Sequence, residues 1–200
     1  MNISNSEIRA RALVTLGGNI FSRPWLLPIG MMLVVSIVLF AANYLCLGIG
    51  TLLLCGPLYV GLYKSFLKIA RKDEDLTFDC VFEGCYNFGQ NLSLGIMHTL
   101  IITLWSLLLI VPGIIKYYSY AMAYYVKADN PEYTYRECLD ESAYLMQGNK
   151  MKLFKLHLSM IGWFLLSILT FGIGALWLNV YMHTATAIFY DELKEQCMYE

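Results

Sequence analysis

Three long stretches of the chain contain no charged side chain. Asp, Glu, Lys and Arg are absent from 24–63, from 84–115 and from 156–190. Because roughly 20 apolar residues span the hydrocarbon core of a bilayer, each stretch is too long for one membrane-crossing helix and long enough for two. The pattern therefore predicts a membrane protein built from hairpins of transmembrane helices.

The overall composition agrees with this prediction. Hydrophobic residues make up 58% of the 200 residues and charged residues only 14%, whereas about 25% of a typical soluble domain is charged. The formal net charge is −1, so the chain has no basic field of the kind that attracts nucleic acid. We expect membrane lipids, and no nucleic acid, among its partners.

Each uncharged stretch contains a glycine or proline turn. We expect these turns at 47–50, 111–113 and 171–174, because glycine and proline are the strongest local breaks in a helical pattern. Division at the turns predicts an all-α, polytopic fold with six transmembrane helices arranged as three hairpins. The expected spans are 25–46, 50–70, 92–111, 113–128, 151–171 and 174–192.

A cytoplasmic amphipathic helix is expected before each hairpin, at 4–18, 76–89 and 134–148. Ser4-Asn5-Ser6-Glu7 and Thr134-Tyr135-Arg136-Glu137 both have the capping-box pattern that starts a helix. Gly18-Asn19 and Gly148-Asn149 follow these two patterns at the same spacing, and glycine can end a helix in a left-handed conformation. The chain is thus predicted to be a single integral membrane domain, 1–200, in which one unit is used three times.

The distribution of Lys and Arg predicts the orientation in the membrane. Six spans place both termini on one side, together with the connections 71–91 and 129–150. All of the 14 Lys and Arg residues except Lys116 lie on or near that side, and these residues mark the cytoplasmic side. We therefore expect both termini in the cytoplasm. The first apolar run is longer than a typical signal-peptide core, so we expect it to be a retained span.

Lys116 and the tyrosines that follow it are candidates for ligand binding or for lining a path. Tyr117, Tyr120 and Tyr124 share one helical face. An ionisable residue within a membrane is a candidate functional site, but a lysine near the surface can also extend its ammonium to the headgroups. Packing and hydrogen bonding between helices is the favoured explanation of the tyrosines, and a ligand path is the alternative.

A second group of candidates forms a polar stripe on the expected span 174–192. Its members follow one another at intervals of four, three and four residues: Asn179, His183, Thr186 and Tyr190. Such side chains often hydrogen-bond to neighbouring helices, or they could line a path. His98 and His157 are expected at a comparable depth, but a metal site needs converging ligands. We expect no metal and no cofactor.

Several motifs of known chemistry are missing from the sequence. No Asp or Glu lies in the interior of an expected span, although ion-coupled carriers usually need such a carboxylate. The sequence has no H-E-x-x-H motif, no G-x-S-x-G nucleophile elbow and no Walker or dinucleotide phosphate loop. We expect no catalytic residues and no enzymatic activity.

Six sequence blocks resemble the signature of a known family. In chain order they are Leu16–Asn19, Pro112–Tyr120, Ala128–Pro131, Gln147–Lys150, Leu158–Trp163 and Leu169–Trp177. They resemble a family of bacterial integral membrane proteins, mainly Gram-positive, that is catalogued as a domain of unknown function. The resemblance covers nearly the whole chain and implies a six-helix protein of the bacterial plasma membrane, without implying an activity. A looser similarity in layout, to the membrane part of some glycerophosphodiester phosphodiesterases, concerns the fold alone.

The sequence favours a non-enzymatic membrane protein that binds a lipid or a partner protein, as a scaffold, accessory subunit or regulator. A membrane or cytoplasmic partner protein would contact the amphipathic helices. The alternative is a channel or facilitator for a small molecule, lipid or ion, with Lys116 and the stripe 179–190 along its path. A third class is an intramembrane enzyme that uses the histidines.

Overall fold

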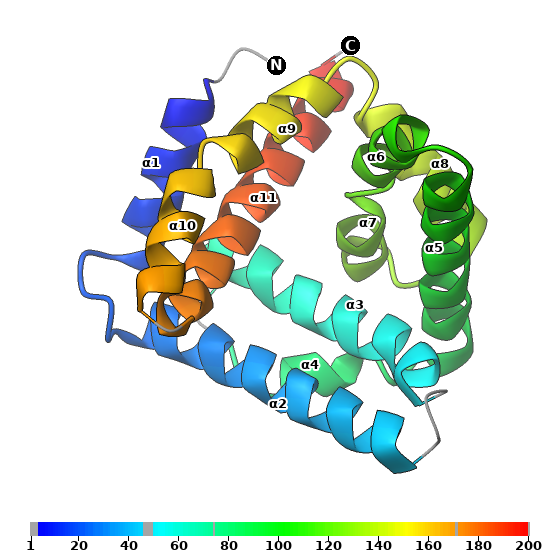
Figure 1. Cartoon of the computed structure of the whole chain (residues 1–200), viewed down its shortest axis with the longest axis horizontal. Coiled ribbons are helices and arrows are strands. Elements are labelled where there is room, and N and C mark those ends of the chain that lie inside the picture. The colour runs from blue at the N-terminus through cyan, green and yellow to red at the C-terminus, as the bar shows by residue number, and fades with distance from the viewer. Residues whose placement is uncertain (1–3, 46–49, 74, 171, 200) are drawn as a thin grey trace.

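The structure of the chain is a computed structural model that describes residues 4–45, 50–73, 75–170 and 172–199 (Figure 1). The described residues are mostly helical and include no β-strand, which confirms the all-α class. The helices are α1 (Asn5–Leu16), α2 (Arg23–Leu45), α3 (Gly50–Ala70), α4 (Asp79–Glu83), α5 (Phe88–Leu108), α6 (Ile110–Ser119), α7 (Ala123–Asp129), α8 (Tyr135–Leu145), α9 (Lys150–Leu158), α10 (Ile161–Leu169) and α11 (Ile173–Tyr199). Three helical stretches are long and apolar enough to cross a membrane: Arg23–Leu45, Gly50–Ala70 and Lys150–Ile168.

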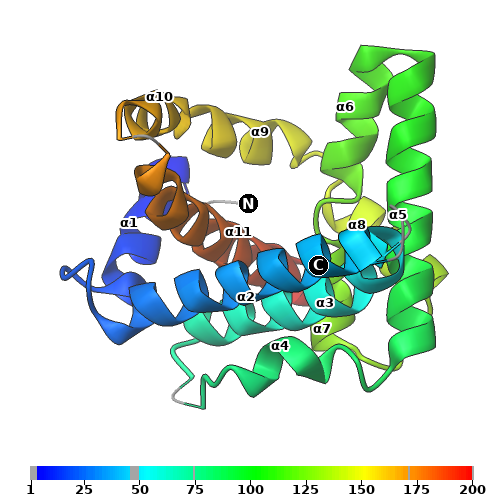
Figure 2. The same cartoon turned by 60° about the horizontal axis from the view of Figure 1, so that its bottom comes forward.

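The helix α3 is the central element of the fold. It packs against α2, α4, α5, α7 and α11, and the pairs α5–α6 and α10–α11 extend from this centre (Figures 1 and 2). Glycines allow the closest approaches. A Cβ atom on Gly61 would lie 1.9 Å from the carbonyl oxygen of Val81, and one on Gly56 would lie 2.1 Å from that of Asn91. These glycines let the backbone that follows α3 pack directly on it, as small residues do between membrane helices.

The helix α1 lies along α11 rather than beside the α2–α3 pair. The hydroxyl of Tyr181 donates to the carbonyl oxygen of Arg9 (3.3 Å), and the indole N–H of Trp177 donates to that of Ile20 (3.0 Å). The residues of α1 that are fully buried are Ile8, Ala12 and Leu16. The helix that precedes the first expected hairpin therefore packs against the last one.

The expected caps of the first and third amphipathic helices are confirmed. The hydroxyl of Ser4 accepts a hydrogen bond from the N–H three residues later (3.3 Å), and Thr134 and Glu137 form a complete capping box. Glycines with positive φ follow both helices, Gly17 at 79° and Gly148 at 70°. The first of these glycines comes one residue earlier than the repeat predicts.

The middle amphipathic helix is much shorter than the expected 76–89. Only α4 is α-helical, and a turn connects it to α5, which begins at Phe88. A Cβ atom on Gly84 would lie 2.0 Å from the carbonyl oxygen of Pro57, and the carbonyl of Gly84 accepts a hydrogen bond from the Asn91 side chain (2.5 Å). Close packing of this turn on α3 replaces the second half of the predicted helix.

The turn between α5 and α6 comes before the expected position, 111–113. Leu109 has extended backbone, with φ −159° and ψ 136°, and α6 begins directly after it. Pro112 therefore lies in the first helical turn, where proline is tolerated. A Cβ atom on Gly113 would lie 2.6 Å from the hydroxyl oxygen of Ser106, so this glycine permits close packing of α6 on α5.

The other two expected turns lie partly outside the described residues, which omit 46–49 and 171. Next to the second gap, Gly172 has φ 84° and the N–H of Gly174 donates to the hydroxyl of Thr170 (3.0 Å). These features agree with a turn between α10 and α11.

The expected spans 113–128 and 151–171 are each divided into two helices. In the first, the helix stops at Ser119 and starts again after Met122. Ser142 of α8 satisfies this break, because its hydroxyl accepts from the N–H of Met122 (3.2 Å) and donates to the carbonyl of Ser119 (2.9 Å). Irregular backbone within a membrane protein needs such partners, since an unpaired backbone group is costly away from water.

Replacing Ser142 by alanine should destabilise the protein, because it leaves a buried N–H and a buried C=O without a partner. We expect a loss of about 1–3 kcal/mol, measured as a lower thermal unfolding midpoint in lipid nanodiscs. The control is Ser36→Ala, because the exposed Ser36 bonds only to the carbonyl of Met32 in its own helix (2.8 Å). Equal losses in the two variants would contradict this role of Ser142.

Candidate functional site

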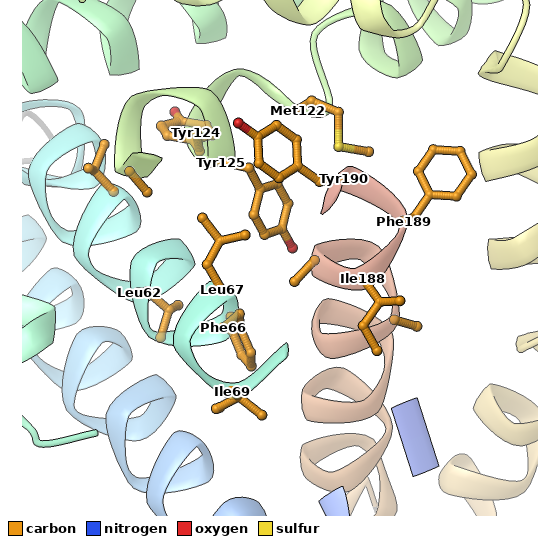
Figure 3. Close-up of a cluster of buried hydrophobic side chains, with 14 of the residues drawn as sticks. Leu62, Phe66, Leu67, Ile69, Met122, Tyr124, Tyr125, Ile188, Phe189 and Tyr190 are labelled. Atoms are coloured by element: carbon orange, nitrogen blue, oxygen red, sulfur yellow. The ribbon is translucent and has the colours of Figure 1, made fainter. Parts of the chain in front are cut away.

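The tyrosines of α7 lie in a buried aromatic cluster between α3, α7 and α11 (Figure 3). Tyr63 of α3 stacks on Tyr124, with 5.3 Å between the ring centroids, and meets Tyr125 edge-on at 4.6 Å. Tyr125 in turn stacks on Tyr190 of α11 at 5.8 Å. Aromatic pairs contribute about 0.5–1.5 kcal/mol each beyond the area that they bury. Of the predicted site residues, Tyr124 and Tyr190 therefore hold helices together.

The polar stripe of α11 is divided between two sides of the helix bundle. His183 stacks on Phe66 of α3 (4.9 Å), in the same aromatic cluster as Tyr190. Thr186 faces α9 instead, where its hydroxyl oxygen lies 3.4 Å from Nε2 of His157. The structure therefore does not bring the stripe to one surface.

A small pocket of about 220 Å³ lies between α10 and α11, and its lining includes Asn179 and His157. Asn179 donates to a carbonyl of its own helix (2.8 Å). Nδ1 of His157 lies 3.4 Å from the hydroxyl of Tyr118, so a polar chain runs from Tyr118 through His157 to Thr186. Of these polar side chains, His157 and Asn179 border the pocket.

Lys116 lies against α5 rather than against α11. Its ammonium is 5.3 Å from the ring centroid of Trp105 and 5.4 Å from that of Tyr120. Such cation–π contacts contribute about 0.5–1 kcal/mol at exposed sites. Tyr117 is 47% exposed. These contacts give Lys116 and Tyr120 a local partner and leave Tyr117 at the surface.

The three histidines do not converge on one point. His98 contacts the ring of Tyr124 (4.9 Å) and His183 contacts that of Tyr63 (5.4 Å), whereas His157 contacts Thr186 of α11 (3.4 Å). No group of three or more His, Cys, Asp or Glu side chains that could hold a metal ion occurs among the described residues.

The sequence interpretation missed an ionic cluster that joins the C-terminal parts of α3, α7 and α11. Arg71 contacts Asp129 (Nη1 to Oδ1, 2.7 Å) and Asp191 (Nη2 to Oδ1, 2.7 Å), and Lys194 also pairs with Asp129. We call these four residues the Arg71 cluster. Burial alone would raise the pKa of Asp129, but the hydrogen bonds from Arg71 and Lys194 hold this pKa below its ordinary value. Asp129 and Asp191 both lie at the ends of expected spans. This shared position is the sequence signal that could have predicted the cluster.

Lys127 is a second charged residue that the sequence interpretation missed. It is only 1% exposed, and its ammonium donates to Oε1 of Gln90 (2.7 Å) and to the carbonyls of Pro131 (2.8 Å) and Tyr133 (2.5 Å). The ammonium of Lys127 has three N–H groups and three acceptors, and these hydrogen bonds compensate for the loss of water on burial. Lys127 thereby ties the end of α7 to α5.

An apolar pocket of about 470 Å³ lies between α1, α10, α11 and the start of α2. These helices lie together at one end of the molecule, away from α5 and α6 (Figure 2). The side chains that line the pocket include Trp25, Trp163, Leu166, Trp177 and Tyr181. Pockets for small ligands measure about 300–1,000 Å³ and have mostly apolar and aromatic walls, so this pocket has the size and character of a binding site.

Arg9 is the charged residue that lines this pocket. Two positions along α1, Arg11 forms ion pairs with Glu7 and Glu192. No Asp or Glu of the described residues pairs with Arg9. The Arg9 side chain hydrogen-bonds with Tyr181, and a guanidinium that has no carboxylate partner at an apolar pocket is available for an anionic group of a ligand.

The sequence contained only part of the signal for this pocket. Arg9 and Leu13 are one turn apart on the expected helix 4–18, and Trp163 and Trp177 lie on either side of the last expected turn. The pocket exists because α1 packs against α11. That contact joins two distant segments, and no local pattern predicts it.

Comparison with protein families found one match. Residues 107–197 match the model of a family described as "Protein of unknown function (DUF975)". The expected resemblance to an uncharacterised family is thereby confirmed for this part of the chain. No curated protein and no solved structure matches the chain.

The Arg71 cluster should make the stability of the protein depend on acid pH. The depressed pKa of Asp129 means that its stabilising charge is fully present above the unfolded pKa and is lost as the pH falls through the folded pKa. We expect the thermal unfolding midpoint to fall below about pH 4. Asp129→Asn should lower this midpoint at neutral pH and should weaken its acid dependence.

The exposed Asp140 of α8 provides the matched control. Asp140→Asn removes the same charge without touching the cluster, so its midpoint should follow that of the unmodified protein at every pH. An acid dependence in Asp129→Asn as steep as that of the unmodified protein would show that Asp129 does not cause it.

Proposed function

We propose that this chain is a non-enzymatic integral membrane protein that binds a membrane lipid in the pocket between α1, α10 and α11. The observation that carries the proposal is the pocket itself, which measures about 470 Å³ and has apolar walls with three tryptophans. Tryptophan is enriched where a membrane protein meets the headgroup region. A lipid chain is the apolar ligand that a bilayer supplies in excess.

The proposed arrangement has six spans in a bacterial plasma membrane, with both termini in the cytoplasm. Three helical stretches have the required length and hydropathy, and α5, the pair α6–α7 and α11 would supply the other spans. The Arg71 cluster supports this topology. Arg71, Asp129 and Asp191 lie at the expected inner ends of three different spans and contact one another.

The side chains of the pocket support binding rather than catalysis. The hydroxyls of Ser159 and Ser167 each donate to a carbonyl of their own segment (2.7 Å). None of the described residues that line the pocket is a His, Asp or Glu. A serine nucleophile needs a neighbouring base of this kind, so the pocket offers a surface for a ligand and no activated nucleophile.

A substitution that fills the pocket should remove the lipid. Leu166 lines the pocket, so Leu166→Trp should displace a bound chain. The measurement is native mass spectrometry of protein extracted from its own membranes into lipid particles without detergent exchange. The unmodified protein should retain a stoichiometric lipid, and Leu166→Trp should lose it.

Leu165→Trp is the matched control, because Leu165 is 62% exposed and does not line the pocket. This variant should retain the lipid. An unmodified protein that carries a stoichiometric partner protein and no lipid would contradict lipid binding and favour a scaffold. Lipid retention by Leu166→Trp would place the lipid elsewhere.

A facilitator is the second candidate function, and the pocket of about 220 Å³ beside His157 and Asn179 favours it. In this case His157→Leu and Asn179→Leu should abolish the uptake of glycerol into proteoliposomes, because both side chains line this pocket. The measurement is the rate of vesicle swelling by stopped-flow light scattering. If the unmodified protein takes up glycerol no faster than empty vesicles, this path for glycerol is ruled out. Uptake that both variants retain would rule it out as well.

A further inference from the structure

We infer that the pocket between α1, α10 and α11 selects a lipid with an anionic phosphate headgroup, which Arg9 binds while an acyl chain occupies the apolar part. The inference rests on the proposed function, because it concerns the same pocket, and it adds the class of lipid. Four observations support it.

The first observation is the difference between the two arginines of α1. Arg11 is neutralised by Glu7 and Glu192, whereas Arg9 lines the pocket and pairs with no described carboxylate. A guanidinium forms two parallel hydrogen bonds with a phosphate or carboxylate group. Arg9 is therefore the group that an anionic ligand would contact.

The second observation is that most of the other polar groups of the pocket are already occupied. The hydroxyl of Tyr181 and the indole N–H groups of Trp25 and Trp177 each donate to a backbone carbonyl, at 3.0–3.3 Å. The hydroxyl of Thr170 also donates to a carbonyl (2.8 Å). These groups stabilise the pocket walls and compete little for a headgroup.

The third observation is the separation of charge and apolar surface along α11. Tyr181 contacts the backbone of Arg9, whereas Trp177 and Gly174 line the pocket further toward the start of the helix. At 1.5 Å per residue, the distance along the axis from Gly174 to Tyr181 is roughly 10 Å. The cation and the apolar walls of the pocket therefore lie at different positions along α11.

The fourth observation is that no described Asp or Glu lines the pocket. A zwitterionic headgroup carries an ammonium as well as a phosphate, and this ammonium would find no acidic side chain. The only formal charge on the described lining is positive. The pocket should therefore favour a net anionic headgroup over a zwitterionic one.

The test uses the full chain in nanodiscs that contain equal amounts of phosphatidylglycerol and phosphatidylcholine with identical acyl chains. Native mass spectrometry measures which lipid stays bound after release from the disc. The unmodified protein should retain mainly phosphatidylglycerol. Arg9→Gln should lower the ratio of the two retained lipids about tenfold, the effect of losing one charged hydrogen-bonding group.

Two control variants separate charge from structure. Arg9→Lys keeps the positive charge and should keep most of the preference for phosphatidylglycerol. Lys155→Gln removes a positive charge from an exposed side chain of α9 that does not line the pocket, and it should leave the ratio unchanged. A reduced ratio in Lys155→Gln equal to that in Arg9→Gln would overturn the role of Arg9.

The total amount of retained lipid distinguishes the two proposals. An unchanged ratio in Arg9→Gln, with lipid lost from Leu166→Trp, overturns the headgroup inference and leaves lipid binding in place. Equal retention of the two lipids by the unmodified protein would also overturn the headgroup inference and leave lipid binding in place. Retention of neither lipid by the unmodified protein contradicts both proposals.

Discussion

The ionic contact of Arg71 with Asp129 and Asp191 holds together three helices that are distant in the sequence. It joins the C-terminal parts of α3, α7 and α11, and the packed rings of Tyr63, Tyr125 and Tyr190 fill the space between the same helices. Removal of one partner from a partly buried ion pair leaves an uncompensated charge. This contact therefore helps to fix the position of α11 relative to α3 and α7.

The candidate lipid pocket is a consequence of that position. The Arg71 cluster fixes the C-terminal part of α11. The N-terminal half of this helix packs with α10 and α1. The bonds from Trp177 and Tyr181 to backbone carbonyls attach the segment that contains α1. Arg11 completes the attachment through Glu192, which leaves Arg9 as the cation beside the apolar walls. The helix α1 thus contributes both to the packing of the fold and to the proposed lipid pocket.

Local patterns predicted those features that depend on short-range physics. The caps at Ser4 and Thr134 were predicted because a hydroxyl followed by a glutamate satisfies free N–H groups within a few residues. The helical class followed from the uncharged stretches. The same reasoning predicted a long helix over 76–89 and an unbroken one over 113–128, which the structure does not contain. In both places a tertiary hydrogen bond, from Asn91 or Ser142, replaces helical bonds.

The sequence by itself determined that the chain is helical, apolar and divided by uncharged stretches, because helix caps and hydropathy act over a few residues. It also identified Tyr124, His183 and Tyr190 as candidates for ligand binding or for lining a path. Only the tertiary structure decided that these side chains pack in an aromatic cluster and that Arg9 lies at a pocket with no carboxylate partner among the described residues. Those outcomes depend on contacts between segments that are distant in the sequence, such as that of α1 with α11, and no periodicity within one segment specifies them.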